Sequence, residues 1–210
     1  MYQLADLQNI IINHELVTIR HYQTEDFLQL EKIFETEFFE WFFTNYATCQ
    51  EFVTEKLAAC SKGELVFLVM VDNITKKIIG TSSLSEISYR HKRLEMGSSW
   101  LARKYQGTYY NALNKYLLID YLLNKLQFLR IQWKTDALNK KSQVAMGKLG
   151  FIYEGTLRRH AITTSGRVRD SQVFAVTDLD WPEVSQIIIK RLIDKKYSGQ
   201  ALDLPYKPIE

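Results

Sequence analysis

One strand–helix–strand unit constrains the fold of this chain more than any other feature of its sequence. The predicted strand Leu94–Leu101 leads through a loop with Gly107 into the long, mostly apolar segment Asn111–Leu126, and a second predicted strand, Arg130–Thr135, follows. Short apolar or alternating segments are typical of strands, and a long apolar segment after a glycine turn is typical of a helix. The connection between the two strands is therefore predicted to be a right-handed crossover.

The segments on either side of this unit predict a layered fold. Three strands that precede the long helix are expected to form an antiparallel meander: Leu65–Val71, Ile78–Ser85 and Leu94–Leu101. The other predicted elements are a strand at Leu16–Tyr22, a helix from the N-cap Thr24 through Phe34, a helix at Cys49–Cys60, a short helix from the cap Asn139 to Gly150, strands at Tyr153–Ile162 and Val168–Thr177, and a helix that begins at Trp181. This order predicts an α/β or α+β fold with a mixed, mostly antiparallel central sheet flanked by helices.

The length of the chain favours a single domain. A chain of 210 residues usually forms one domain with a sizeable core. We expect an N-terminal extension over residues 1–15, the main domain over residues 16–181, and a C-terminal helix and tail over residues 182–210, packed on the same domain or trailing from it. Pro205 and Pro208 indicate that the last residues form a loose tail.

Composition excludes several classes of protein. Hydrophobic residues are 46% and charged residues 24% of the chain, which is a globular and not a disordered balance. The longest apolar run, Leu65–Val71, is far shorter than the roughly 20 residues of a membrane-spanning helix, so no membrane association is predicted. The first residues lack the features of a signal peptide. Nucleic-acid binding is not predicted either, because acidic residues offset the basic ones and no binding motif is present.

Cysteine and histidine are too scattered to predict a disulfide framework or a metal site. The two cysteines, Cys49 and Cys60, belong to no CxxC or Cys/His cluster, and His14, His21 and His91 lack ligand spacing. A reduced, cytoplasmic chain without a bound metal is the simplest interpretation.

Charge is unevenly distributed along the chain, although the net charge is only +3. Residues 23–64 hold nine acidic against three basic residues, and residues 130–170 hold nine basic against three acidic residues. Such asymmetry can direct opposite charges to opposite parts of a molecule. The alternative is that both stretches are solvated faces of helices and strands.

The loop with Gly107 is a candidate phosphate site, because the unpaired backbone N–H groups at a helix start bind anions. A lone glycine at such a turn is a weak signal, but further short motifs follow it: Asn139-x-x-Ser142, Lys148-Leu149-Gly150-Phe151, Glu154-Gly155-x-Leu157-Arg158-Arg159 and Gly166-Arg167-x-Arg169-Asp170. Together they resemble the Gcn5-related N-acetyltransferase (GNAT) superfamily over Leu16–Trp181, and within it the branch of the ribosomal-protein N-terminal acetyltransferases.

The resemblance implies a site for acetyl-CoA as cosubstrate. In the family, backbone groups at the end of a strand pair with the pantetheine arm, and the matching residues here are Trp100, Leu101 and Ala102. The pyrophosphate loop matches Gln106, Gly107, Thr108, Tyr109, Tyr110 and Asn111. Tyr109 stands where the family has its central glycine, and Asn111 stands where it has Gly or Ala. Asn139 matches an asparagine that contacts the CoA arm.

Acetyl transfer to an amine needs a base for the ammonium group and a donor for the departing thiolate. The resemblance implies Ser142 as the donor, because the tyrosine that many members use is replaced by Met146. The alternative role for Ser142 is to support the start of its helix. Glu95 and His160 are the candidate bases, although each is also explained as a structural residue, and deprotonation through water stays open.

The resemblance implies an amine acceptor: a protein N-terminus, a peptide or a small cationic amine. The aromatic run Phe38–Phe43 is explained either as core or as lining of the acceptor groove. The acidic stretch would suit a cationic acceptor, and the basic stretch would suit the CoA phosphates. A non-catalytic module of the same fold that binds acyl-CoA or a protein partner is the alternative function. A homodimer is a further possibility.

Overall fold

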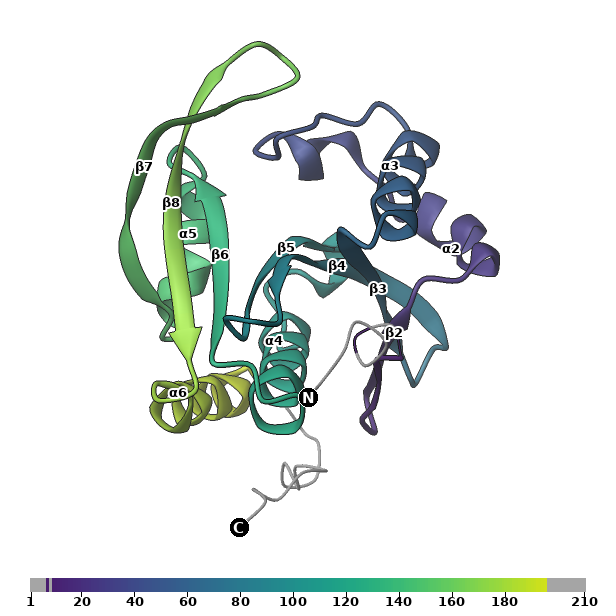
Figure 1. Cartoon of the computed structure of the whole chain (residues 1–210). Helices are drawn as coiled ribbons and strands as arrows, with labels where there is room; N and C mark the ends of the chain where they lie inside the picture. Colours follow the sequence, from purple (N-terminus) through teal and green to yellow (C-terminus); the bar gives the residue numbers. More distant parts are fainter. Residues whose placement is uncertain (1–6, 8, 196–210) are drawn as a thin grey trace.

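A mixed sheet forms the centre of the molecule (Figure 1). The computed structural model describes residue 7 and residues 9–195, and within them the sheet has eight strands in the order β1-β2-β3-β4-β5-β6-β8-β7. The strands are β1 (Ile11–Asn13), β2 (Val17–His21), β3 (Leu65–Asp72), β4 (Lys77–Ser88), β5 (Arg93–Leu101), β6 (Arg130–Asp136), β7 (Ile152–Ile162) and β8 (Val168–Thr177). Only β5 and β6 pair in parallel, as the strand–helix–strand unit predicts. The mixed, mostly antiparallel fold is therefore confirmed.

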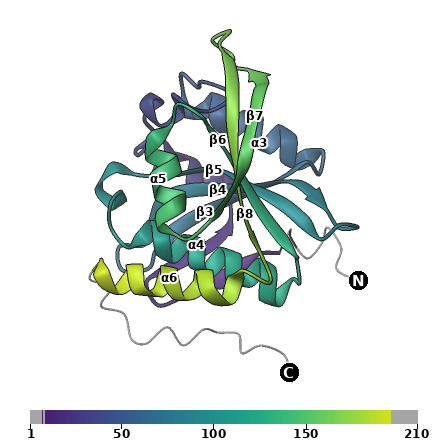
Figure 2. The same ribbon diagram turned by 90° about the vertical axis from the view of Figure 1, so that its left-hand side faces the viewer.

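Helices cover both faces of the sheet. The helical elements are η1 (Thr24–Asp26), α2 (Phe27–Glu31), η2 (Thr36–Phe39), α3 (Cys49–Ser61), η3 (Arg103–Tyr105), α4 (Tyr110–Asp120), the π-helical turn η4 (Tyr121–Lys125), α5 (Lys140–Lys148) and α6 (Trp181–Asp194). α2 contacts β4 and α3 contacts β3 on one face, whereas α4 packs against α6 and β2. Figure 2 shows α3 and α5 on opposite sides of the sheet.

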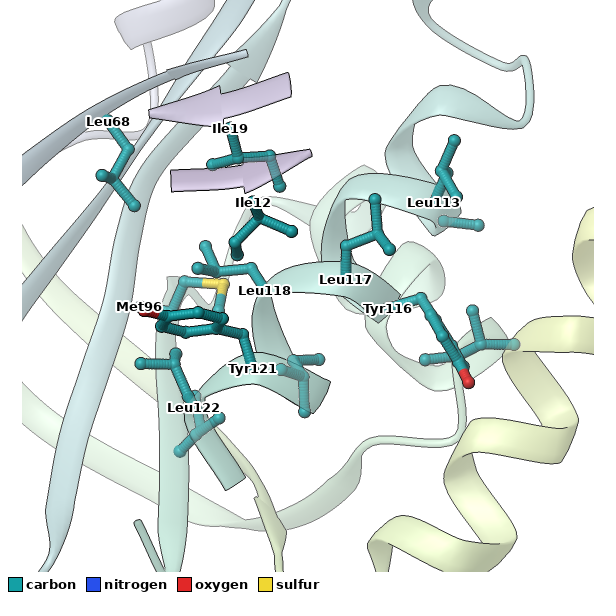
Figure 3. Packing of buried hydrophobic residues seen from close by; sticks show 14 of the residues in the cluster. Ile12, Ile19, Leu68, Met96, Leu113, Tyr116, Leu117, Leu118, Tyr121 and Leu122 are labelled. Atoms are coloured by element: carbon teal, nitrogen blue, oxygen red, sulfur yellow. The ribbon is translucent and has the colours of Figure 1, made fainter. Parts of the chain in front are cut away.

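Alternation along the strands divides the core into two clusters. Successive side chains of a strand point to opposite faces, so Leu68 joins the α4 cluster, whereas Phe67 and Val69 join the aromatic cluster beneath α2 and α3. Figure 3 shows Met96 among the side chains of α4. Nine residues of α4 are buried, so this helix is the centre of the larger cluster and holds the sheet beneath it.

The predicted helix over Thr24–Phe34 is wrong in its extent and in its cap. It begins as a single 3-10 turn with Gln23 as N-cap, and α2 ends after five residues. The Asp26 carboxylate explains this turn, because it accepts from the Gln23 N–H at 2.8 Å and from the Arg20 guanidinium at 2.7 and 2.8 Å. The chain then leaves the helix, and the aromatic residues that follow pack as a ring cluster.

The residues before the first predicted strand contribute to the sheet. β1 pairs with β2, and Leu7, Ile10 and Ile12 are fully buried. A three-residue strand is too short for a periodic pattern to reveal it. The boundary of the predicted extension stays a prediction, and the predicted tail over residues 196–210 lies outside the described residues.

Gly80 fixes the distance between β4 and the end of β5. A Cβ atom at Gly80 would clash with the Trp100 carbonyl oxygen and lie 2.8 Å from Leu101 Cδ2. Only glycine lets the two strands approach so closely. Gly80 thereby places the last residues of β5, which are the ones expected to pair with the cofactor.

We expect Gly80→Ala to lower the free energy of unfolding by about 1 to 3 kcal/mol, the usual cost of overpacking. Gly147→Ala is the control: a Cβ there meets nothing within 4 Å, and alanine favours a helix over glycine by about 0.5 to 1 kcal/mol. Urea unfolding measures both variants. A Gly80→Ala protein as stable as the wild type would contradict this role of Gly80.

Candidate active site

β5 and β6 separate soon after they meet, and this separation leaves part of β5 unpaired. They pair at three positions, Arg93–Arg130, Leu94–Ile131 and Glu95–Gln132. Within the described chain, the β6-facing side of Met96–Leu101 has no strand partner; we call this segment the open edge of β5. Ser98 has a φ of +46°, and the register with β4 shifts here, as at a β-bulge, which bends a strand.

The open edge can bind an extended ligand that carries amide groups. Unpaired backbone N–H and C=O groups on a strand edge accept an added strand. The Leu101 carbonyl accepts from Gln106 Nε2 at 2.8 Å. Ala102 is committed within the protein, because its N–H donates to Ile79 and its carbonyl accepts from Tyr105, both at 2.9 Å. This favours Leu101 and the residues before it over Ala102 as pairing positions.

Two buried tyrosines anchor the loop between β5 and α4. Tyr105 and Tyr110 flank the loop, and each hydroxyl donates to the Asp72 carboxylate at 3.0 Å. Burial alone would raise the pKa of Asp72, but these bonds and those from Thr75 and the Ile74 N–H hold the pKa below its ordinary value. The ends of the loop are thus tied to the end of β3.

The loop has the open conformation that an anion site requires at one position. Gly107 has a φ of +75°, and a Cβ at this position would meet nothing within 4 Å. The Thr108 hydroxyl accepts from the Tyr110 N–H at 3.3 Å just before α4 begins. Tyr109 has a φ of −71°, so the position needs no glycine, and its ring stacks on Tyr110 at 4.6 Å. Asn111 is a helical residue inside α4, not its cap.

A lysine from α5 reaches this loop. Lys141 Nζ donates to Gln106 Oε1 at 2.9 Å, which places a cation beside the predicted pyrophosphate position. Asn139 caps α5 as predicted, because its side chain accepts from the Ser142 N–H at 3.0 Å. The sequence indicated Lys141 only as one member of the basic stretch, since its approach to Gln106 depends on how α5 packs.

The three candidate catalytic residues occupy different places. Glu95 is buried at the last paired position of β5, where its carboxylate accepts from Lys134 Nζ at 2.8 Å. His160 Nδ1 lies 3.0 Å from Ser171 Oγ, and its ring contacts Phe43. Ser142 is half-buried in the first turn of α5. Among the described residues, no hydrogen bond joins any two of the three.

A buried arginine joins the last strands to the aromatic segment. Arg169 is 2% exposed; it lies 3.8 Å from the Asp136 carboxylate, donates to the Trp41 carbonyl at 3.0 Å and stacks on Phe43 at 3.9 Å. The tip of the β7–β8 hairpin also contacts this segment, because the Thr164 N–H donates to the Phe43 carbonyl at 3.0 Å. These contacts join β8 and the β7–β8 hairpin to the aromatic segment, beside the open edge.

Most of the aromatic run is core. Phe39 is fully buried, and Phe38 stacks on Trp100 at 5.3 Å. Phe43 is the exposed member. The core explanation therefore holds for Phe39, whereas Phe43 stays a candidate for the lining of an acceptor groove.

The comparisons with known proteins identify the class of this site. The sequence model described as "Acetyltransferase (GNAT) domain" matches residues 17–152, which include the open edge, the loop 106–111 and Lys141. The chain belongs to the GNAT acetyltransferase family. It is accordingly an acetyl-CoA-dependent N-acetyltransferase.

Solved structures support the same fold. A GCN5-related N-acetyltransferase from Brucella melitensis is 26% identical, with a TM-score of 0.77 over 88% of this chain and 86% of that one. Ribosomal-protein-S5-alanine acetyltransferase from Vibrio fischeri is 21% identical, with a TM-score of 0.66 over 82% and 99%. Spermidine N-acetyltransferase from Vibrio cholerae, in complex with CoA and spermine, is 20% identical, with a TM-score of 0.67 over 80% and 99%. No curated protein sequence matches the chain.

The described residues contain neither a candidate membrane-spanning helix nor a candidate metal site. No helix there is long and apolar enough to cross a membrane. No group of three or more His, Cys, Asp or Glu side chains there could hold a metal ion.

We expect Gly107→Glu to weaken CoA binding at least tenfold, or about 1.4 kcal/mol, because it places a carboxylate beside two phosphates. Gly107→Gln is the matched control, since it has the same size and the same strained φ but no charge. Calorimetric titration with CoA compares the two variants. Equal affinities for the Glu and Gln variants would show that the loop does not face the phosphates.

Proposed function

We propose that the enzyme transfers the acetyl group of acetyl-CoA to a primary amine by direct attack within a ternary complex. The observation that carries the proposal is the open edge of β5, which continues into the loop 106–111 and so offers an extended cofactor both a strand partner and an anion site. Direct attack is supported by the position of the cysteines: both lie on α3, and none lies on β5, β6, α4 or α5.

The charge on the face of β5 that points away from α4, where Glu95 lies, favours a cationic acceptor. Lys134 bridges Glu95 and Glu86, with Nζ–Oε distances of 2.8 and 2.6 Å. Two carboxylates share one ammonium group, so one negative charge remains. An amine that arrives as an ammonium ion is attracted to such a site. Glu95 is accordingly proposed to hold the acceptor or a water that takes its proton, with His160 as the alternative base.

The acceptor is proposed to be a protein N-terminus, a peptide or a small cationic amine. Two structures of this fold have names that indicate these classes, one a ribosomal-protein alanine acetyltransferase and the other a spermidine acetyltransferase. We infer a cytoplasmic location from the two cysteines, which are free thiols.

An amine panel tests the acceptor class. Thiol release from acetyl-CoA is measured with peptides that begin with a free α-amine, with the same peptides acetylated at the N-terminus, and with spermidine. We expect turnover with at least one free amine and none with the blocked peptides. Tight binding of acetyl-CoA without turnover on any amine would contradict the proposed reaction and favour a binding module.

Ser142 is proposed to donate a hydrogen bond to the departing sulfur. Loss of one positioned donor costs on the order of a hundredfold in rate, so Ser142→Ala should lower kcat by that order and leave CoA affinity nearly intact. Its hydroxyl has no hydrogen bond to a described residue, and the cap of α5 comes from Asn139. Stability should therefore change little.

Asn139→Ala is the control for a role in the helix start, because it removes the cap and should cost about 1 kcal/mol of stability. Thermal unfolding and single-turnover rates separate the two effects. A Ser142→Ala protein with a lower melting temperature and an unchanged kcat would assign Ser142 to the helix start instead.

A further inference from the structure

A lysine on α4 lies against the open edge of β5. Lys115 Nζ is 3.0 Å from Ser99 Oγ and 3.2 Å from Met96 Sδ, and it lies 5.7 Å from the centre of the Trp133 ring. Met96 and Ser99 belong to the open edge, and Trp133 is the first residue of β6 beyond its pairing with β5. The amine therefore sits between the two strands just where they part.

Among the described residues, no acidic side chain forms an ion pair with the Lys115 ammonium group. None of the ion pairs recorded among the described residues includes it. Glu95 precedes Met96 and Lys134 follows Trp133 in the sequence, but these two charged side chains pair with each other. Asp120, on α4 itself, accepts from Trp181 Nε1, and Lys141 on α5 engages Gln106. Burial alone is the cause that lowers the pKa of Lys115, to about 7.

A structural role explains this arrangement poorly. A half-buried lysine without a carboxylate partner destabilises the fold, and an apolar side chain of similar length would pack there at lower cost. The hydroxyl and thioether contacts offer little compensation, because both are weak partners for an ammonium group. Titratable groups with a strongly shifted pKa are concentrated at functional sites.

The expected path of the cofactor ends beside this lysine. An arm that pairs with the open edge runs from the loop 106–111 past Leu101 toward Ser99, against the chain direction of β5. Its thioester end thus approaches the residue whose hydroxyl contacts Lys115 Nζ. α4 brings Lys115 to the cofactor side of the sheet, whereas Glu95 lies on the other side of β5.

We propose that Lys115 is a catalytic residue that protonates the sulfur of coenzyme A as the acetyl group leaves. This inference rests on the proposed acetyl transfer to an amine. The amine nitrogen forms a bond to the thioester carbon, the carbon–sulfur bond breaks, and its electron pair goes to sulfur. Lys115 Nζ–H gives its proton to this sulfur, and the neutral lysine then takes up one of the two protons that the ammonium acceptor loses.

The pKa values of Lys115 and of the thiol favour proton transfer from the lysine to the sulfur. A thiol has an ordinary pKa of about 8.5, which is above the lowered pKa of Lys115, so the proton moves favourably from nitrogen to sulfur. A serine hydroxyl does not ionise in this range and can only stabilise the thiolate by a hydrogen bond. Ser142 and Lys115 therefore have separate tasks on the two helices that border the open edge.

The test uses Lys115→Met, which keeps the length of the side chain without the amine, and Lys115→Arg, which keeps the charge but does not release its proton. Lys190→Met, at an exposed position on α6, is the control. We expect both Lys115 variants to lower kcat at least about a hundredfold, the lower end of the range of general acid catalysis, while the control keeps the wild-type kcat. The decline of kcat as pH rises above about 7 should also disappear in both Lys115 variants.

A second readout needs no acceptor. The ultraviolet absorbance of bound CoA reports the pKa of its thiol. A cation beside the sulfur lowers that pKa. Arginine stays charged throughout the titration, so we expect a lower pKa of the bound thiol in Lys115→Arg than in Lys115→Met. The wild-type value should lie between them, because Lys115, with a pKa of about 7, is largely neutral when the thiol ionises. If Lys115→Met does not fold, the comparison of Lys115→Arg with the wild type still tests proton donation through kcat.

Two results would overturn the role of Lys115: a wild-type kcat and pH profile in both variants, or the same pKa of bound thiol in Lys115→Arg and Lys115→Met. Acetylation of Lys115 by acetyl-CoA at the rate of turnover, detected by mass spectrometry, would also overturn it, because an amide cannot donate this proton. If the wild type acetylates no amine, the proposed function fails, and the titration of bound CoA still reports on Lys115.

Discussion

The parting of β5 and β6 after Glu95 and Gln132 is the constraint on which the rest of the site depends. Parallel strands normally satisfy each other's backbone groups along their whole length. Here three residue pairs join the strands, and the open edge follows. An uncovered edge is usually a liability that proteins protect. In this enzyme, α4 and α5 stand beside it, and the cofactor is the partner proposed to complete it.

β5 and β6 cannot close the gap between them, because each is held by the strand on its other side. β6 pairs with β8 along its full length to Asp136, and Arg169 holds that end from a buried position. β5 follows β4 to its own end, where Gly80 permits the close approach to Leu101. The bulge at Ser98 then turns β5 away. The gap is therefore built by contacts on both sides of it and does not require the ligand.

The sequence predicted this architecture where local chemistry decides the structure. Gly107 marked the loop, and Asn139 marked the start of α5, because turns and caps depend on a few adjacent residues. The positive φ of Ser98 and the π turn after α4 could not be predicted, since packing imposes them. Lys115 was missed for the same reason: a single lysine in an apolar helix resembles a surface residue until the sheet beneath it is placed.

Hydrogen exchange of the backbone amides, with and without acetyl-CoA, tests the central claim that the cofactor completes the open edge. The account predicts slower exchange within residues 96–101, where β4 bonds only one side of the strand, and in the loop 106–111. Amides of β1 and β2, at the far end of the sheet, should exchange at unchanged rates. Unchanged exchange over residues 96–101 at saturating acetyl-CoA would contradict the account, whatever the protection elsewhere.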